Sequence, residues 1–346
     1  MRLILHTGAG KTGTSAIQAA LAQLRPDLAT AGILYPLADN GPGSHPDDEG
    51  VARGNAGLLG SFLNPNKHGP SFSKAAIFAW LDGILAEAAG RDILLSSEAM
   101  QFVRGPQAAE LVHHFVARGY DTTVIFYVRH VLDHAISGYL QNLKRGQIGA
   151  DAQGKRRSQA AFFRAFRCPF VASLEPFAAV LPPERLIVRL YDKERPTLVD
   201  GFLRLVSDHP FPKVAGERIF NRSPTAAEQV VFTELARLES GDRLCRTLQD
   251  LMLDTPTSEP TDVTLTEEQF TAFAERNQSV VDAINQTWLK GHGELRMKSD
   301  RIRIGAEEPV SQASINAAFA RAIALLDGAN RARQRAANRE TRRRPG

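Results

Sequence analysis

Residues 3–15 read LILHTGAGKTGTS, an apolar run followed at once by a turn that contains Gly8, Gly10 and Gly13. The run predicts a buried strand, and a helix is expected to begin near Ala16. Glycines let backbone N–H groups approach an oxyanion, and the N-terminus of a helix adds partial positive charge. The stretch therefore predicts a loop that binds phosphate or sulfate, with candidate ligands Gly10, Lys11, Thr12, Gly13, Thr14 and Ser15.

The spacing of this loop differs from that of the nucleoside-triphosphate P-loop. That motif requires a glycine five residues before its Gly-Lys pair, and the corresponding position here is Leu5, inside the predicted strand. The sequence also shows no apolar strand that ends in an aspartate placed to hold magnesium. We therefore expect an anion site that works without a metal ion.

Short apolar runs rich in β-branched residues alternate with longer amphipathic stretches over much of the chain. This alternation is typical of parallel strands joined by crossover helices, and it predicts an α/β fold with an open parallel sheet flanked by helices. Ligands of such sheets bind beyond the carboxyl ends of the strands, which makes the segments after Thr7, Ser96 and Val128 candidate binding segments. The predicted strands are residues 2–7, 92–96, 122–128 and 186–191, and the predicted helices are 15–24, 74–89, 107–118 and 131–144.

The expected α/β core covers residues 1–223, and a mostly helical region, residues 224–328, is expected to extend the same domain. Residues 38–73 are dense in Gly, Pro, Asn and Asp, which predicts a long loop of the kind that forms lids or binding segments. Within the helical region, residues 266–289 form the clearest predicted helix. A capping box between Thr266 and Gln269 is expected at its start.

Composition indicates an ordinary soluble chain with a basic end. The net charge is +4, but residues 329–346 hold seven arginines and one glutamate, so the rest of the chain carries −2. We expect this end to be a disordered basic tail, and we expect no nucleic-acid binding. No run approaches the roughly 18 apolar residues of a membrane span. The two distant cysteines, Cys168 and Cys245, suggest neither a disulfide framework nor a zinc site, which fits a cytoplasmic protein.

A second anion site is predicted after the strand 122–128. Arg129 ends this strand, and Ser137 follows eight residues later in the predicted helix. Since two helical turns cover about seven residues, the arginine and the serine can face one pocket. Arginines at strand ends also often pair with carboxylates, so Arg129 and Ser137 alone are weak evidence for a second anion site. Their combination with the glycine-rich loop of residues 8–15 makes the evidence stronger.

Two stretches of the sequence together resemble the sulfotransferases that use 3′-phosphoadenosine 5′-phosphosulfate (PAPS). They are LHTGAGKTGTS, residues 5–15, and VIFYVRHVLDHAISGY, residues 124–139. The phrases GILYP, LLSSE and NRS, at residues 32–36, 94–98 and 221–223, are similar to bacterial-type members. The resemblance spans about residues 1–223.

This resemblance implies a P-loop-like parallel sheet and a nucleotide-binding role for both motifs. Lys11 to Ser15 would hold the 5′-phosphosulfate, and Arg129 and Ser137 the 3′-phosphate, of PAPS and of its product PAP. In cytosolic eukaryotic members a glycine-rich basic segment near the C-terminus also binds the nucleotide. No segment here matches it well, and Asn221 to Ser223 is the remaining candidate.

Sulfuryl transfer needs a cation near the leaving group and a base near the acceptor hydroxyl. Lys11 is the predicted cation. Glu98, directly after the strand 92–96, is the first candidate for the base, although it could instead pair with Arg104. His45, in the predicted long loop, is the second candidate.

Three other histidines are predicted to have structural roles. His6 is expected to pack within the first strand. His130 and His134 are expected on helix faces away from both phosphates.

The acceptor follows only from the family, whose members suggest a carbohydrate or glycolipid hydroxyl, with a small alcohol or phenol open. Two other functions remain: a small-molecule kinase that uses a nucleoside triphosphate, and a non-catalytic nucleotide-binding protein. Magnesium dependence would mark the kinase. Binding of the donor product without transfer would mark the binding protein.

Overall fold

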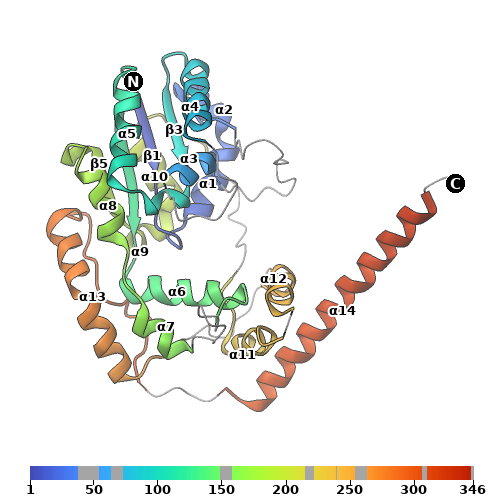
Figure 1. The fold of residues 1–346 in the computed structure, drawn as a ribbon. Coiled ribbons are helices and arrows are strands. Elements are labelled where there is room, and N and C mark those ends of the chain that lie inside the picture. Colours follow the sequence, from blue (N-terminus) through green and yellow to red (C-terminus); the bar gives the residue numbers. More distant parts are fainter. Residues whose placement is uncertain are drawn as a thin grey trace. The chain divides into compact units, whose positions relative to one another are not determined.

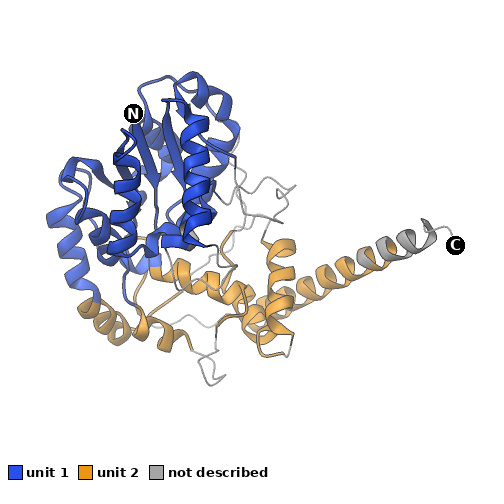
Figure 2. Cartoon of the chain, turned by 45° about the horizontal axis from the view of Figure 1, so that its top comes forward, with its two compact units in different colours: residues 1–134, 167–217, 277–297 blue, residues 135–166, 218–276, 298–346 orange. Residues whose placement is uncertain are grey.

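The computed structural model describes residues 1–37, 54–63, 73–148, 158–214, 222–238, 240–253, 263–305 and 310–343. The chain divides into two compact units, which are coloured separately in Figure 2. Unit 1 comprises residues 1–134, 167–217 and 277–297. Unit 2 comprises residues 135–166, 218–276 and 298–346.

Unit 1 is built on a five-stranded sheet of order β2-β3-β1-β4-β5. Strands β1, β3 and β5 are labelled in Figure 1. Every paired strand is parallel. The predicted open parallel sheet is therefore confirmed. Its strands are β1 (Arg2–His6), β2 (Ile33–Leu34), β3 (Asp92–Ser96), β4 (Asp121–Val128) and β5 (Leu186–Leu190).

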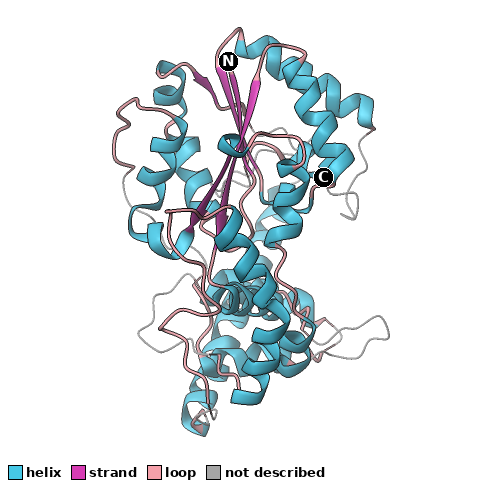
Figure 3. Ribbon diagram, turned by 90° about the vertical axis from the view of Figure 1, so that its left-hand side faces the viewer, coloured by secondary structure: helices cyan, strands magenta, loops and turns pink. Residues whose placement is uncertain are grey.

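Helices cover both faces of the sheet, as Figure 3 shows with the sheet almost edge-on. One face packs its apolar side chains against α1 (Thr14–Gln23), α2 (Arg25–Thr30) and α10 (Leu198–Val206). The other face carries α4 (Lys74–Ala88), α5 (Gly105–Val116) and α8 (Phe170–Ala178). The remaining elements of unit 1 are α3 (Gly57–Leu63), α9 (Tyr191–Glu194), η1 (Glu98–Phe102), η2 (Pro183–Arg185) and η3 (Arg195–Thr197).

The apolar character of the strands explains this sandwich. In β1, Leu3, Ile4 and Leu5 are all buried, because helices shield the strand from above and below. Burying each such side chain stabilises the fold by about 1.5–3 kcal/mol. The strand is thereby fixed in the middle of the sheet, and the glycine-rich turn leaves from its carboxyl end.

Unit 2 is helical. It contains α7 (Gln159–Ala165), α11 (Ala226–Leu235), α12 (Gly241–Met252) and α14 (Gln312–Arg343). It also holds most of α6 (Val131–Lys144), which begins in unit 1, and the first half of α13 (Glu267–Thr287), which ends there. Ring contacts, some stacked and some edge-on, form an aromatic core in this unit. Its residues are Tyr139, Phe162, Phe163, Phe166 and Phe273.

Most predicted elements appear within a few residues of the expected bounds. The capping box is present, since Thr266 N–H donates to Gln269 Oε1 and Gln269 N–H donates to Thr266 Oγ1, both at 3.2 Å. Strand β2 was missed because two residues carry no periodicity. Of the predicted loop 38–73, residues 57–63 form α3, while 38–53 and 64–72 lie outside the described residues.

The C-terminal part of the chain differs from the expectation. Residues 329–343, predicted to be disordered, continue α14 as helix. Alanine and arginine are strong helix formers, and an i,i+4 pair between Asp327 and Arg331 supports the helix at this point. The division into units also departs from the expected boundary near residue 223, because residues 135–166 belong with the C-terminal helices.

Candidate active site

The glycine-rich turn, residues 8–15, is called the phosphate loop below. It follows β1 after Thr7, whose amide still donates to the carbonyl of Ile125 in β4 at 3.1 Å. Helix α1 begins within the loop, at Thr14, and the Gly13 carbonyl accepts hydrogen bonds from the amides of Ala16 and Ile17 at 3.0 and 3.1 Å. The first N–H groups of α1 therefore face the loop without helical acceptors. The predicted succession of strand, turn and helix is therefore present, and anion binding by this loop stays a prediction.

Two residues in the loop have left-handed backbone conformations. Gly13 has φ 81°, and Lys11 has φ 71°, which is unusual for a residue with a side chain. Two hydrogen bonds hold this shape: Thr12 Oγ1 donates to the carbonyl of Ala9 at 2.5 Å, and Arg129 Nη1 donates to the carbonyl of Lys11 at 3.2 Å. The loop is thus held from within and from the end of β4.

Polar side chains gather beneath Gly8. A Cβ atom at this position would lie 3.0 Å from Thr14 Oγ1, 3.1 Å from His6 Nε2 and 3.3 Å from Thr12 Oγ1. The Thr14 hydroxyl is buried and has no hydrogen-bond partner among the described residues. A buried hydroxyl normally finds a partner. An anion in the loop could supply one for Thr14.

His6 packs beneath the loop as expected. It is fully buried, and its Nδ1 lies 2.9 Å from Ser96 Oγ in β3. Burial lowers its pKa from 6.5 to about 3, so the imidazole stays neutral at physiological pH. It therefore brings no charge to the loop.

Arg129 lies at the carboxyl end of β4, next to the phosphate loop. Its guanidinium donates to Lys11, lies 5.5 Å from the centre of the Tyr191 ring, and has its Nε 3.8 Å from Asp192 Oδ1. These contacts bring Arg129 to the loop that follows β1, and its role at a second phosphate stays a prediction. The contacts with Tyr191 and Asp192, at the start of α9, were not predicted.

His134 departs from the expectation for this region. Its pKa is lowered to about 4, first by burial and then by the positive charges of Arg129 and Lys11. Both charges act on one side chain, so His134 lies near the two candidate cations and not on a remote helix face. Sequence spacing missed this because it could not show how the first turn of α6 lies against the loop.

Ser137 occupies α6 two turns beyond Arg129, in the portion of the helix that belongs to unit 2. Its role at the second phosphate stays a prediction from the sequence. The start of α6 is fixed within unit 1, because the amides of Val131 and Leu132 donate to the carbonyls of Arg296 and Met297 at 3.2 and 2.8 Å.

Glu98 begins η1, just after β3, and is half-buried. Its Oε2 lies 3.8 Å from the position that a Cβ atom of Gly10 would take. Gln101, one turn later, accepts a hydrogen bond from the Gly10 amide at 3.1 Å. A carboxylate therefore lies beside the phosphate loop, where a base would be useful. Gln101 is a loop contact that sequence reasoning missed.

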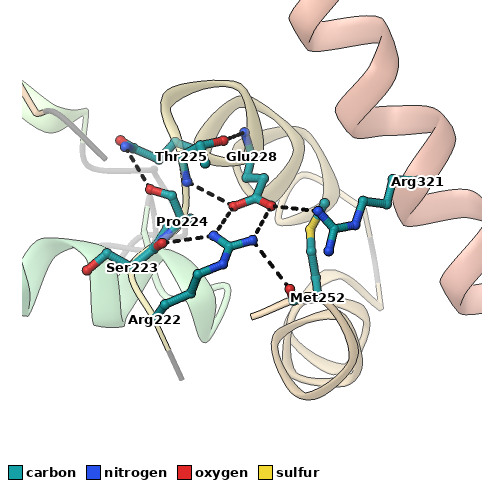
Figure 4. A network of polar contacts seen from close by, with 8 residues as sticks. Arg222, Ser223, Pro224, Thr225, Glu228, Met252 and Arg321 are labelled. Atoms are coloured by element: carbon teal, nitrogen blue, oxygen red, sulfur yellow. Dashed lines mark hydrogen bonds and ion pairs between the residues drawn. The ribbon is translucent and has the colours of Figure 1, made fainter. Parts of the chain in front are cut away.

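Two other sequence candidates have different outcomes. His45 lies outside the described residues, as does Asn221. The guanidinium of Arg222 donates to both carboxylate oxygens of Glu228 at 2.7 Å (Figure 4). It also donates to the carbonyls of Ser223 and Met252, at 3.0 and 3.4 Å. Arg222 thus joins the start of α11 to the end of α12 within unit 2, a structural role.

A separate cavity of about 620 Å³ runs along the open edge of β5. It is lined by both apolar and basic side chains, but no candidate residue of the phosphate loop, nor Arg129 or Glu98, is among them. The cavity and the predicted site are therefore distinct features of unit 1. Its lining residues include Leu186, Val188, Arg189, Trp288, Lys290 and His292.

The described residues contain no group of three or more His, Cys, Asp or Glu side chains arranged to hold a metal ion. No helix among them is long and apolar enough to cross a membrane.

Comparison with known proteins gave one kind of match. No protein-family model matches the chain, and no curated protein does either. Among solved structures, the chain is similar to a crystal structure of a sulfotransferase from Alicyclobacillus acidocaldarius. The TM-score is 0.36, the identity is 16%, and the match covers 70% of this chain and 96% of that one. A likeness of this size does not identify the donor or the acceptor.

Proposed function

We propose that the chain is a sulfotransferase that moves a sulfuryl group from PAPS to an acceptor hydroxyl. The observation that carries the proposal is the phosphate loop at the end of the central strand, with the guanidinium of Arg129 hydrogen-bonded to its Lys11 carbonyl. Two cationic side chains at neighbouring strand ends suit a ligand with more than one anionic group. The sequence motifs around these residues favour PAPS as that ligand.

The residues of the loop fit a phosphosulfate. The buried Thr14 hydroxyl without a described partner, the first amides of α1 and the Lys11 ammonium are all hydrogen-bond donors. We propose that Lys11 to Ser15 hold the 5′-phosphosulfate and that Arg129, with Ser137, holds the 3′-phosphate. Gly10 and Gly13 let the backbone approach the anion.

The transfer requires two contributions from the protein: neutralisation of the leaving group's charge and removal of the acceptor's proton. The acceptor oxygen forms a bond to sulfur as the bond from sulfur to the bridging phosphate oxygen breaks, and the 3′,5′-bisphosphate leaves with added negative charge. Lys11 would neutralise that charge, which lowers the barrier because it grows toward the transition state. Glu98 would accept the proton of the hydroxyl, since it lies beside Gly10. His45 remains the second candidate for this base.

The acceptor class and the compartment are also proposals. A carbohydrate or glycolipid hydroxyl follows from the resemblance to bacterial-type sulfotransferases, and a cytoplasmic location from the cysteine content. A screen of hydroxyl-bearing acceptors with radiolabelled PAPS would test the first. Transfer to none of them, together with tight PAP binding, would favour the non-catalytic alternative.

Calorimetry with adenosine 3′,5′-bisphosphate and ADP, in buffer without magnesium, tests the donor directly. We expect a clear preference for the bisphosphate, because the second phosphate needs the cation at Arg129. Equal binding would remove the two-phosphate site. Tighter binding of ATP after magnesium is added would instead support the kinase alternative.

A further inference from the structure

Asp192 lies beside Arg129 because two parallel strands end together. Val128 of β4 pairs with Leu190 of β5, so the residues that follow the two strands are neighbours. Asp192 Oδ2 accepts a hydrogen bond from the His130 amide at 2.8 Å, and its Oδ1 lies 3.8 Å from Arg129 Nε. One carboxylate thus contacts both the backbone and the side chain at the end of β4.

Arg129 is held on three sides by these neighbours. Its Nε lies 3.8 Å from Asp192 Oδ1 in an ion pair without a hydrogen bond, its Nη1 donates to the carbonyl of Lys11, and its Cζ lies 5.5 Å from the centre of the Tyr191 ring. Its side chain keeps 21% of its surface exposed, and that of Asp192 keeps 19%. A guanidinium has five N–H groups in a fixed plane, so the ion pair at Nε and the hydrogen bond at Nη1 together restrict where the other N–H groups point.

The hydrogen bond from Arg129 to Lys11 connects this arginine to the phosphate loop. Lys11 has a left-handed backbone, which is strained for a residue with a side chain. Arg129 donates to the Lys11 carbonyl and thereby favours this conformation. The contacts therefore run from Asp192 through Arg129 to the loop.

We infer that Asp192 is a positioning residue of the donor site. It orients Arg129 so that the guanidinium braces the phosphate loop at Lys11 and presents its outer N–H groups to the 3′-phosphate. This inference rests on the proposed function, because it assigns the specificity of the second phosphate site to a residue that does not touch the nucleotide.

Electrostatics makes the inference testable. A carboxylate this close to an anion site repels every anion, so removing its charge raises or leaves unchanged the affinity for anions in general. Loss of orientation acts only on the ligand that needs the fork of Arg129 in one place. Asp192→Asn should therefore lower the preference for the bisphosphate over ADP by about tenfold, which corresponds to about 1.4 kcal/mol. Its affinity for ADP should not fall.

The experiment compares the full-length wild-type chain with Asp192→Asn and Asp192→Ala. Asn keeps an acceptor for the His130 amide, whereas Ala removes it, so Asn serves if Ala fails to fold. Asp200→Asn, an exposed carboxylate in the first turn of α10, is the matched control for the change in charge. Calorimetry gives the bisphosphate-to-ADP affinity ratio for each chain, and circular dichroism gives its Tm.

The outcomes separate the two ideas. A ratio that falls in Asp192→Asn but stays at the wild-type value in Asp200→Asn, with ADP affinity kept, supports the positioning role. A wild-type ratio in both Asp192 variants overturns it and leaves the sulfotransferase proposal standing. A parallel loss of ADP and bisphosphate binding also overturns it, because that pattern is a general structural defect. A wild-type chain without any preference removes the proposed function and this inference together.

Discussion

Replacing Gly13 by alanine should damage unit 1 more than the same change at another left-handed glycine. Gly13 has φ 81°, and a Cβ atom there would lie 2.2 Å from Leu198 Cδ2 and 2.9 Å from Tyr191 Cε2. Gly32 has a similar φ of 76°, but nothing lies within 4 Å of its Cβ position. The pair therefore separates backbone strain from steric overlap.

The magnitudes follow from these two contributions. Placing an L-residue in the left-handed region costs about 1–2 kcal/mol at either position. Overpacking adds about 1–3 kcal/mol at Gly13 only. Leu198 cannot yield cheaply, because it is buried in the core cluster between α1, α10 and the sheet. We expect a loss of about 2–5 kcal/mol for Gly13→Ala and about 1–2 kcal/mol for Gly32→Ala.

Tryptophan fluorescence during urea unfolding measures the free energy of unfolding of unit 1 for both variants. The chain has two tryptophans, Trp80 and Trp288, and both belong to unit 1. Gly13→Ala should also weaken binding of the bisphosphate, whereas Gly32→Ala should not. Equal destabilisation by the two substitutions would show that Leu198 and Tyr191 do not press on the loop, and the packing argument would be wrong.

Four further predictions concern charge and burial. Lys11→Ala should lower sulfuryl transfer by about 100-fold or more while weakening bisphosphate binding less; unchanged turnover of labelled PAPS would refute its role. Glu228→Gln should destabilise unit 2 by about 3 kcal/mol in far-UV circular dichroism, because it leaves the largely buried guanidinium of Arg222 beside a neutral partner. The control Glu234→Gln, which removes the exposed ion pair with Arg237, should lower the free energy of unfolding by less than about 1 kcal/mol. Equal losses for Glu228→Gln and Glu234→Gln would contradict the argument from burial. Stability should fall as the pH drops below 6.5, since His6, with a folded pKa of about 3, stays neutral while the unfolded chain takes up a proton; His6→Gln should flatten this dependence of Tm on pH. Cys168, whose pKa burial raises to about 12, should resist iodoacetamide in the native chain, and rapid labelling found by peptide mapping would show that it is accessible.

Local patterns accounted for most of the secondary structure. The long strands and helices of the core were predictable because apolar residues recur at the strand or helix period within a single segment. Strand β2 was not, since two residues, Ile33 and Leu34, are too short to show a period. The end of α14 was misjudged for a different reason: a polar, arginine-rich composition was taken as disorder, although alanine and arginine favour a helix.

The residues of the candidate site likewise include some that the sequence predicted and others that it did not. The phosphate loop and the two residues at strand ends, Arg129 and Glu98, could be named from the sequence because ligands bind beyond the carboxyl ends of parallel strands. The same rule applies to Tyr191 and Asp192, which directly follow β5. Gln101 gave no comparable signal.

The sequence by itself therefore determined the strand, the glycine turn and the helix start that make the phosphate loop proposed to bind an anion, because each depends on residues next to one another in the chain. Only the tertiary structure decided which distant groups surround that loop. Arg129 reaches the carbonyl of Lys11 across 118 residues, and Asp192 meets Arg129 because β5 pairs with β4 in the observed register. Strand order and register follow from the packing of whole faces, which no single segment of sequence records.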